Sequence, residues 1–265
     1  MEFPAATSFA GFTTLLQKEC MRFIRVAGQT LISPLISVSL YLLIFGINLA
    51  DKIANQNGVN YLQFIIPGLV ALALLNNAFQ NASSSIIISK FHGDLQDLKV
   101  VPLTPSQIVW AYAFAGTIRG FLVGISVACI GEIFYVVQYG ELLVVQNWLQ
   151  LCWFLIAGGV TFSLLGLSVA LFANNFDQVS AVGTFVILPL IYLGGVFFSI
   201  ANMHPFWKMI SYANPLLYLI NGIRYSFLGV SDIDPSRAFL LTLFFVAGAY
   251  LLARRMVQVG SYTRF

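Results

Sequence analysis

Charged side chains are scarce in this sequence. Only 9% of its 265 residues are Asp, Glu, Lys or Arg, whereas 59% are hydrophobic. A soluble domain of this composition would leave large apolar patches in contact with water. The sequence therefore predicts an integral membrane protein. Because its apolar runs are about twenty residues long, the spans are expected to be helices, and not the roughly ten-residue alternating strands of an outer-membrane barrel.

Residues that build catalytic and metal sites are also few. Cys20, Cys129 and Cys152 form no C-x-x-C pair, so we interpret them as packing groups and predict neither a disulfide framework nor a zinc site. His92 and His204 fall on opposite sides of the topology given below and cannot share a metal. The sequence has no phosphate-binding G-x-x-x-x-G-K-S/T loop and no H-E-x-x-H motif. We expect no metal, no cofactor and no ATP hydrolysis in this chain, and no nucleic-acid partner.

Six segments are long and apolar enough to cross a membrane. They are Leu31 to Leu49, Tyr61 to Phe79, Ile108 to Phe134, Trp148 to Phe172, Val179 to Phe198 and Ala238 to Ala253. Both termini are predicted in the cytoplasm, because more basic residues then lie inside than outside. The inside set is Lys18, Arg22, Arg25, Lys90, Lys99, Arg254, Arg255 and Arg264, and the outside set is Lys52, Lys208, Arg224 and Arg237.

Two predicted cytoplasmic segments are amphipathic. Residues 7–28 alternate apolar and basic side chains, as in a helix that lies along the membrane surface. In the loop of residues 84–105, Phe91, Leu95 and Leu98 share one helical face, and prolines end the helix before the third span. This loop helix is either a simple connector or a docking element for a cytosolic partner.

The stretch of residues 205–229 is apolar but is interrupted at Asn214-Pro215. Asn214 is a good N-cap, Pro215 suits the first helical position, and Gly229 is a plausible C-terminal stop. The helix between them would be about 21 Å long, too short for about 30 Å of hydrocarbon. We expect a re-entrant or interfacial hairpin on the outer side. Its second helix has one apolar face and a second face made of Tyr218, Asn221 and Tyr225.

Polar residues inside the spans have two possible roles each. Arg119 and Glu132 lie in the third span, too far apart along the helix to pair directly. Arg119 is either satisfied by a neighbouring helix or the interface, or contacts a lipid phosphate or substrate. In the second span, two pairs of polar residues are spaced i, i+4: Asn77 with Asn81, and Asn76 with Gln80. These side chains either make interhelical contacts or form the wall of a substrate entrance. Small residues at Gly116, Gly120 and Gly124 predict close helix packing.

The order of these parts resembles ABC type-2 exporter permeases. The stretch "TFVILPLIYLGGVFFSI" followed by "HPFWKMISYANPLLYLINGIRYSFLG" is similar to the C-terminal hallmark of that family. The segments "YLQFIIPGL" and "VPLTPSQIV" agree in order and spacing with bacterial YadH-like inner-membrane members. The resemblance covers essentially the whole chain.

The resemblance implies a single permease domain over residues 1–265, two copies of which pair as a homodimer. Each copy would bind a separate ABC ATPase that carries ATP and Mg²⁺. It places a coupling helix at residues 93–101 beside the N-terminal helix, an outer gate on the re-entrant hairpin, and a pathway along spans one, two and five. The residues that it nominates for coupling are Gly93, Asp97, Leu98, Val101, Pro102, Lys18 and Arg22. Those for the pathway are Tyr41, Phe45, Asn77, Thr184 and Tyr192. Those for the gate are Asn214, Pro215, Tyr218, Asn221 and Arg224.

The predicted function is export of an amphiphilic, lipid-linked or drug-like substrate from the cytoplasm or inner leaflet of a bacterial inner membrane. An ion-coupled secondary carrier that uses Arg119 and Glu132 is the alternative, and it predicts inverted internal repeats, of which none is clear. A lipid-modifying membrane enzyme would need clustered acid, base or metal groups at one depth, which the sequence does not supply.

Overall fold

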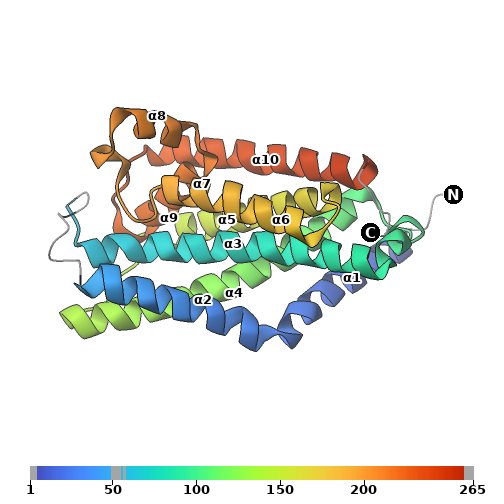
Figure 1. The fold of residues 1–265 in the computed structure, drawn as a ribbon, viewed down its shortest axis with the longest axis horizontal. Helices are drawn as coiled ribbons and strands as arrows, with labels where there is room; N and C mark the ends of the chain where they lie inside the picture. The colour runs from blue at the N-terminus through green and yellow to red at the C-terminus, as the bar shows by residue number, and fades with distance from the viewer. Residues whose placement is uncertain (1–4, 49–54, 56–57, 260–265) are drawn as a thin grey trace.

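The computed structural model describes residues 5–48, 55 and 58–259. These residues form a bundle of helices whose long axis follows α3 (Figure 1). In chain order they are α1 Ala5–Arg25, α2 Ala27–Tyr41, the π-helix η1 Leu42–Asn48, α3 Tyr61–His92, the 3₁₀-helix η3 Asp94–Lys99, α4 Pro105–Tyr139, α5 Trp148–Phe172, α6 Phe176–Val182, the π-helix η4 Gly183–Ile187, α7 Leu188–Leu193, the 3₁₀-helix η5 Ile200–Asn202, α8 Pro205–Ala213, α9 Pro215–Leu228 and α10 Pro235–Val259.

Among the described residues, six helices or unbroken helical runs are long and apolar enough to span a membrane. These are Ala27–Asn48, Tyr61–His92, Pro105–Tyr139, Trp148–Phe172, Phe176–Leu193 and Pro235–Val259. The predicted helical class and all six predicted spans are therefore confirmed. The predicted end of the first span at Leu49, and the positions of Lys52 and Arg264, lie outside the described residues.

The helices α3 and α5 form the centre of the bundle. The most apolar windows of these helices are 89% and 83% buried, whereas those of α2 and of the α6–α7 run are only 17% and 11% buried. The apolar outer surfaces of the peripheral helices suit contact with lipid tails. Cys129 and Cys152 are exposed on α4 and α5, so the interpretation of these two thiols as buried packing groups was wrong.

Close approach of α4 to its neighbours depends on the predicted run of small residues. A methyl group at Gly116 would overlap the hydroxyl of Ser163 on α5, and one at Gly120 would lie 2.8 Å from the carbonyl oxygen of Leu74 on α3. At both positions a larger side chain would force the helices apart. The prediction of a packing face at these glycines is confirmed.

The loop after α3 does not form the helix expected from its pattern. The α-helix of α3 continues to His92 and ends at Gly93, whose backbone is left-handed with φ 90°. Residues 94–99 then form a separate 3₁₀-helix. The predicted common face of Phe91, Leu95 and Leu98 is therefore wrong, because the left-handed glycine breaks the helical register between Phe91 and Leu95.

One further boundary differs from the prediction, and one predicted cytoplasmic cation is buried. The fifth span ends at Leu193 and not at Phe198, because Gly194 caps α7 and Gly195 is left-handed with φ 87°. Lys90, counted among the cytoplasmic basic residues, is buried, with its ammonium group donating to the carbonyl oxygens of Leu171 and Ala173 at 2.8 Å each. A cation at these last carbonyls stabilises the C-terminal end of α5.

Candidate functional site

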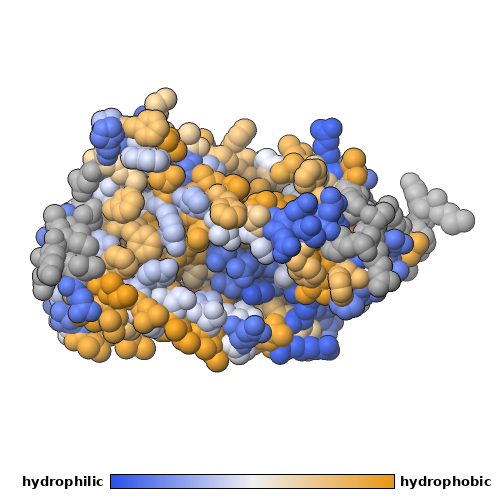
Figure 2. All heavy atoms as spheres, in the orientation of Figure 1, coloured by the Kyte–Doolittle hydropathy of each residue, from blue (hydrophilic) through white to orange (hydrophobic). Residues whose placement is uncertain are grey.

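A polar groove runs along the bundle between α2, α3, α4 and the α6–α7 run. It consists of two overlapping cavities of about 430 Å³ and about 640 Å³. Figure 2 shows a patch of hydrophilic atoms over the middle of α3, bordered by both hydrophobic and other hydrophilic atoms. The residues that line both cavities are Asn76, Gln80, Ser84, Arg119 and Leu188.

The wall that α3 contributes to the groove arises from helical spacing. Asn76, Gln80 and Ser84 recur every four residues and so lie on one face of the helix. The amide nitrogen of Gln80 donates to the side-chain oxygen of Asn76 at 3.2 Å, as the spacing predicted. Asn77 and Asn81 make other contacts: Asn77 donates to the carbonyl oxygen of Ala73 at 2.9 Å, and Asn81 binds a residue of α1.

Arg119 on α4 reaches the groove from behind α3. Its Nη2 donates to the side-chain oxygen of Asn77 at 3.4 Å, and its buried Nε has no hydrogen-bond partner. Glu132, on the same helix, instead accepts a hydrogen bond from the backbone amide of Leu143 at 2.9 Å. The expectation that these two charges do not pair is confirmed. The contact between Arg119 and Asn77 could not be predicted from sequence because it depends on how α3 and α4 are rotated.

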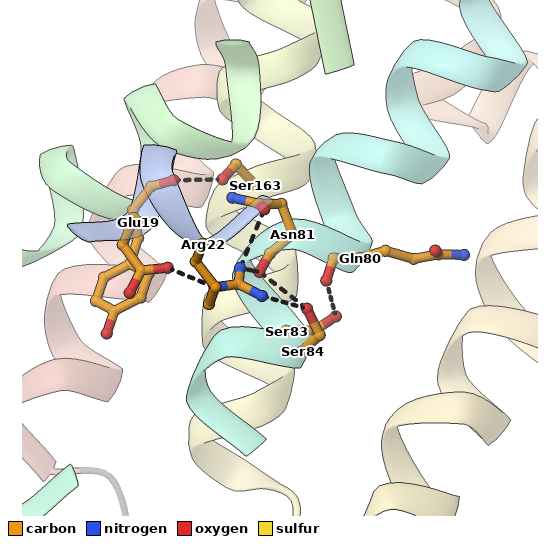
Figure 3. A network of polar contacts seen from close by, with 8 residues as sticks. Glu19, Arg22, Gln80, Asn81, Ser83, Ser84 and Ser163 are labelled. Carbon is orange, nitrogen blue, oxygen red and sulfur yellow. Dashed lines mark hydrogen bonds and ion pairs between the residues drawn. The ribbon is translucent and has the colours of Figure 1, made fainter. Parts of the chain in front are cut away.

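Arg22 joins α1 to the groove, as Figure 3 shows. Its Nε lies 3.2 Å from Oε2 of the buried Glu19, and its Nη2 donates to the backbone and side-chain oxygens of Asn81 at 2.7 and 3.0 Å. Its Nη1 donates to the hydroxyl of Ser84 at 3.3 Å. Arg22 also lines the larger cavity. The side chain nominated for ATPase coupling therefore points toward α3.

Most of the other residues nominated for coupling gather at one end of the bundle. Lys18, Asp97, Leu98 and Val101 line a cavity of about 400 Å³ between α1 and η3. Gly93 caps α3 directly before η3, and Pro102 follows Val101 in the turn that leads to α4. Figure 1 places α1 and the C-terminal end of α10 at this same end. Leu95 fixes η3 to the bundle, since it is buried in a cluster with Leu15 and Tyr112.

The opposite end of the groove is aromatic. A cavity of about 580 Å³ is lined by Tyr41, Phe45, Tyr61, Tyr192, Phe197 and Phe198. Tyr41 and Tyr192 also line the larger polar cavity, so the two spaces are adjacent. Phe197 connects the rings, with centroids 5.6 Å from Tyr41 and 5.4 Å from Tyr192.

The residues nominated for the pathway thus lie along one groove. Tyr41, Phe45 and Tyr192 meet at its aromatic end, while Asn77 and Thr184 line the polar cavities. Sequence reasoning missed Tyr61 and Phe197, which also line the aromatic end. The Tyr61 hydroxyl donates to the carbonyl oxygen of Phe197 at 2.9 Å. The Gly-Gly pair before Phe197 was the available signal, since it ends α7 and turns the chain back toward α3.

The helix α9 has the predicted bounds. The side-chain oxygen of Asn214 accepts from the amide of Leu216 at 3.0 Å, Pro215 is the first helical residue, and Gly229 ends the helix in the left-handed conformation. The side-chain amide of Asn214 also donates to the carbonyl oxygen of Leu190 at 2.5 Å, which ties α9 to α7. Tyr218 donates to the carbonyl oxygen of Tyr212 on α8 at 2.8 Å.

The predicted polar face of α9 is not exposed, and Arg224 does not belong to the exposed outer charges. Both Asn221 and Arg224 are 0% exposed. The Arg224 guanidinium carbon lies 3.8 Å above the Phe64 ring, and its Nη2 donates to the carbonyl oxygen of Gly195 at 2.5 Å. The helical pattern of α9 does not encode this burial, because the guanidinium donates to backbone carbonyls and packs on a ring face of neighbouring elements. Its buried Nη1 has no hydrogen-bond partner among the described residues.

Comparison with known proteins places the chain in a family. A family model described as ABC-2 type transporter matches residues 10–228. The chain is 39% identical over 247 residues to the inner membrane transport permease YadH of Escherichia coli strain K12, covering 93% of this chain and 94% of that protein. It is 25% identical over 241 residues to nodulation protein J of Neorhizobium galegae, covering 88% and 89%. The chain belongs to the ABC-2 type transporter family and is a multi-pass transport permease.

Proposed function

We propose that the chain is the membrane subunit of an ATP-driven exporter of the bacterial inner membrane. It moves an amphiphilic, lipid-linked or drug-like substrate out of the cytoplasm or inner leaflet. Two copies pair, each binding one ABC ATPase that carries ATP and Mg²⁺, with α1 and the end of α10 on the cytoplasmic side. The observation that carries this proposal is the groove, whose polar cavities adjoin an aromatic cavity along the three spans nominated for the pathway.

The groove needs a cover at membrane depth. Its lining exposes side chains of Asn76, Gln80 and Arg119, and polar groups facing hydrocarbon are costly. Its two flanking walls, α2 and the α6–α7 run, are also the two least buried spans. A second copy that packs on these walls would enclose the groove and cover both helices, which supports a homodimer with the pathway at its centre.

The end of the bundle at α1 and η3 suits docking of the ATPase. Asp97 and Leu98 face the cavity there, and Leu95 attaches η3 to α1 and α4. Displacement of η3 would therefore move α1. Because Arg22 on α1 is hydrogen-bonded to Asn81 on α3, movement of α1 would in turn shift the wall that α3 contributes to the groove. Closure of the two ATPases would shift these packed helices and change access to the groove, in the manner of a rigid-body transition.

At the other end, α8 and α9 form the outer gate. They return to the same side because α9 has only 14 residues. Asn214 links α9 to the end of α7, and Arg224 holds the turn at Gly195, next to the aromatic residues of the groove. Movement of α7 would therefore displace the gate directly. Membrane lipids contact the exposed rings of Phe206 and Trp207 on α8.

The carrier alternative has weaker support in the structure. A relay between Arg119 and Glu132 would have to cross about 20 Å of helix, at 1.5 Å per residue. Glu132 is held by the backbone of Leu143 and does not line either polar cavity.

Purification from the native membrane separates the two functions. We expect a tagged copy of the chain, extracted in mild detergent, to bring one ABC ATPase per permease, identified and quantified by mass spectrometry. The same preparation washed in a harsh detergent that dissociates subunits is the control for nonspecific carry-over. Reproducible absence of an ATPase from a preparation that still transports in vesicles would contradict the exporter and favour the carrier.

A further inference from the structure

The groove carries an unbalanced positive charge. Arg22 and Arg119 line its larger cavity, and Arg119 lines both cavities. Within the part of the chain that the structure describes, no Asp or Glu lines either cavity. The charge of Arg22 is offset by Glu19, at 3.2 Å. No carboxylate of the described residues pairs with Arg119. An arginine keeps its charge at every physiological pH.

The hydrogen-bonding capacity of Arg119 is only partly used. Its contact with the Asn77 side chain is 3.4 Å long, which is weak for a cationic donor. Its Nε is buried and has no acceptor. A planar guanidinium with free donors is suited to bind carboxylate or phosphate oxygens, often through two parallel bonds.

The surroundings of Arg119 add neutral polar groups and then apolar surface. Gln80, Ser84 and Asn76 lie beside it in both cavities. The rest of both linings mixes polar and apolar side chains. The polar ones are Ser83, Ser180 and Thr184 in the smaller cavity and Gln29, Thr30, Ser33, Ser37 and Asn77 in the larger one. The apolar ones include Phe79, Ile87 and Val179 in the smaller cavity, Val38, Leu72 and Ile88 in the larger one, and Leu188 in both. A ligand that fills the groove therefore meets a cation among neutral polar groups and scattered apolar side chains, and the adjoining aromatic cavity offers a mainly apolar surface.

We propose that the groove binds the anionic headgroup of an amphiphile, with Arg119 as the main contact and Arg22 as a second cation close to it. The apolar part of the ligand lies along the α3 and α7 walls and leads toward the aromatic cavity. This inference rests on the proposed function, because it takes the groove as the transport pathway. It narrows the substrate class to amphiphiles that carry a phosphate, carboxylate or similar anion.

Binding of a matched pair of lipids to the purified permease tests the proposal. The probes are a fluorescently labelled lysophosphatidic acid and a monoacylglycerol with the same label and chain, measured by fluorescence anisotropy in a non-ionic detergent. We expect the permease to bind the phosphate-bearing probe about tenfold more tightly or better, as one charge-assisted contact would give. Arg119→Gln should bring the two affinities within about twofold of each other, and Arg119→Lys should keep part of the preference.

Arg254→Gln is the matched control, because it removes an exposed arginine on α10 that is absent from the linings of the groove. It should leave the preference unchanged. Inorganic phosphate distinguishes a free anion from a lipid headgroup: we expect it to compete only weakly. Equal binding of the two lipids, an unchanged preference in Arg119→Gln, or binding of inorganic phosphate as tight as that of the lipid would each overturn the proposal.

This measurement uses the permease alone, so it can fail while the exporter assignment holds. If an ATPase co-purifies but the permease shows no anion preference, only the proposed substrate class is wrong. If the permease prefers the anionic lipid but no ATPase co-purifies, the proposed binding site stands and the exporter assignment is contradicted.

Discussion

Replacing Arg224 by alanine is expected to prevent accumulation of folded permease. The side chain is fully buried and holds the turn between α7 and η5 by donating to the carbonyl oxygens of Gly195 and Val196. It also donates to the carbonyl oxygen of Phe64 and packs on that ring, which fixes α9 to α3. Truncation removes these hydrogen bonds and the ring contact and opens a cavity, a loss of about 3–5 kcal/mol.

The yield of monodisperse protein in gel filtration and its unfolding temperature in detergent measure the effect. Arg224→Lys should give an intermediate result, since an ammonium group keeps the charge but lacks the planar fork of donors that reaches the carbonyl oxygens of two separate elements. Arg237→Ala, at an exposed position in the first turn of α10, is the control and should behave as the unchanged protein. Normal yield and unfolding temperature for Arg224→Ala would show that the buried guanidinium does not hold the outer turn.

Asp97→Arg is expected to reduce ATP-driven transport by about tenfold or more while the protein inserts normally, since reversing a charge in a docked interface costs several kcal/mol. Asp97 is exposed on η3 and faces the cavity that Lys18 lines on α1. Leu98→Asp should have the same effect, because it puts a charge on the half-buried side of η3. ATP hydrolysis by the partner should continue without transport or lose its stimulation by the permease.

Transport and ATP hydrolysis are compared in vesicles that contain equal amounts of permease. Glu141→Arg is the matched charge reversal, at an exposed position in the loop between α4 and α5 at the other end of the bundle. It should leave coupling intact. Normal coupling in both Asp97→Arg and Leu98→Asp would contradict the assignment of η3 to ATPase docking.

Local signals predicted the helices well. The bounds of α9 follow from Asn214, Pro215 and Gly229, each of which acts on the backbone within one turn and needs no partner elsewhere. The six spans follow from apolar length alone. The break at Gly93 was missed although its signal is also local, because the apolar spacing across it was given more weight than the glycine.

The contacts of the charged residues could not be predicted in the same way. The sequence predicts that three basic residues, Lys90, Arg22 and Arg224, lie at a membrane surface. In the structure each of them donates to a carbonyl oxygen of another element. These acceptors are backbone atoms of residues 29 to 81 positions away, so no side-chain pattern marks them. Family resemblance nominated Tyr41 and Tyr192 for the pathway, and the ring of Phe197, which contacts both, supplies the physical reason that they meet.

Accessibility of a cysteine at Thr184 tests the central claim, that the groove is the transport pathway. Thr184 is exposed and lines the smaller polar cavity. The variant Thr184→Cys is made in a background in which Cys20, Cys129 and Cys152 are replaced by alanine. A membrane-impermeant maleimide is then applied to either face of vesicles that hold the permease with its ATPase. Val144→Cys, in the exposed α4–α5 loop that the proposed topology puts outside, is the reference for the outer face.

We predict that Thr184→Cys reacts from the cytoplasmic face without nucleotide and that trapping the ATPases with ATP and vanadate lowers this reaction several-fold. Val144→Cys should react only from the outer face, with or without nucleotide. Labelling of Thr184→Cys that is absent from both faces, or that nucleotide does not change, would contradict the assignment of the groove as an ATP-controlled pathway.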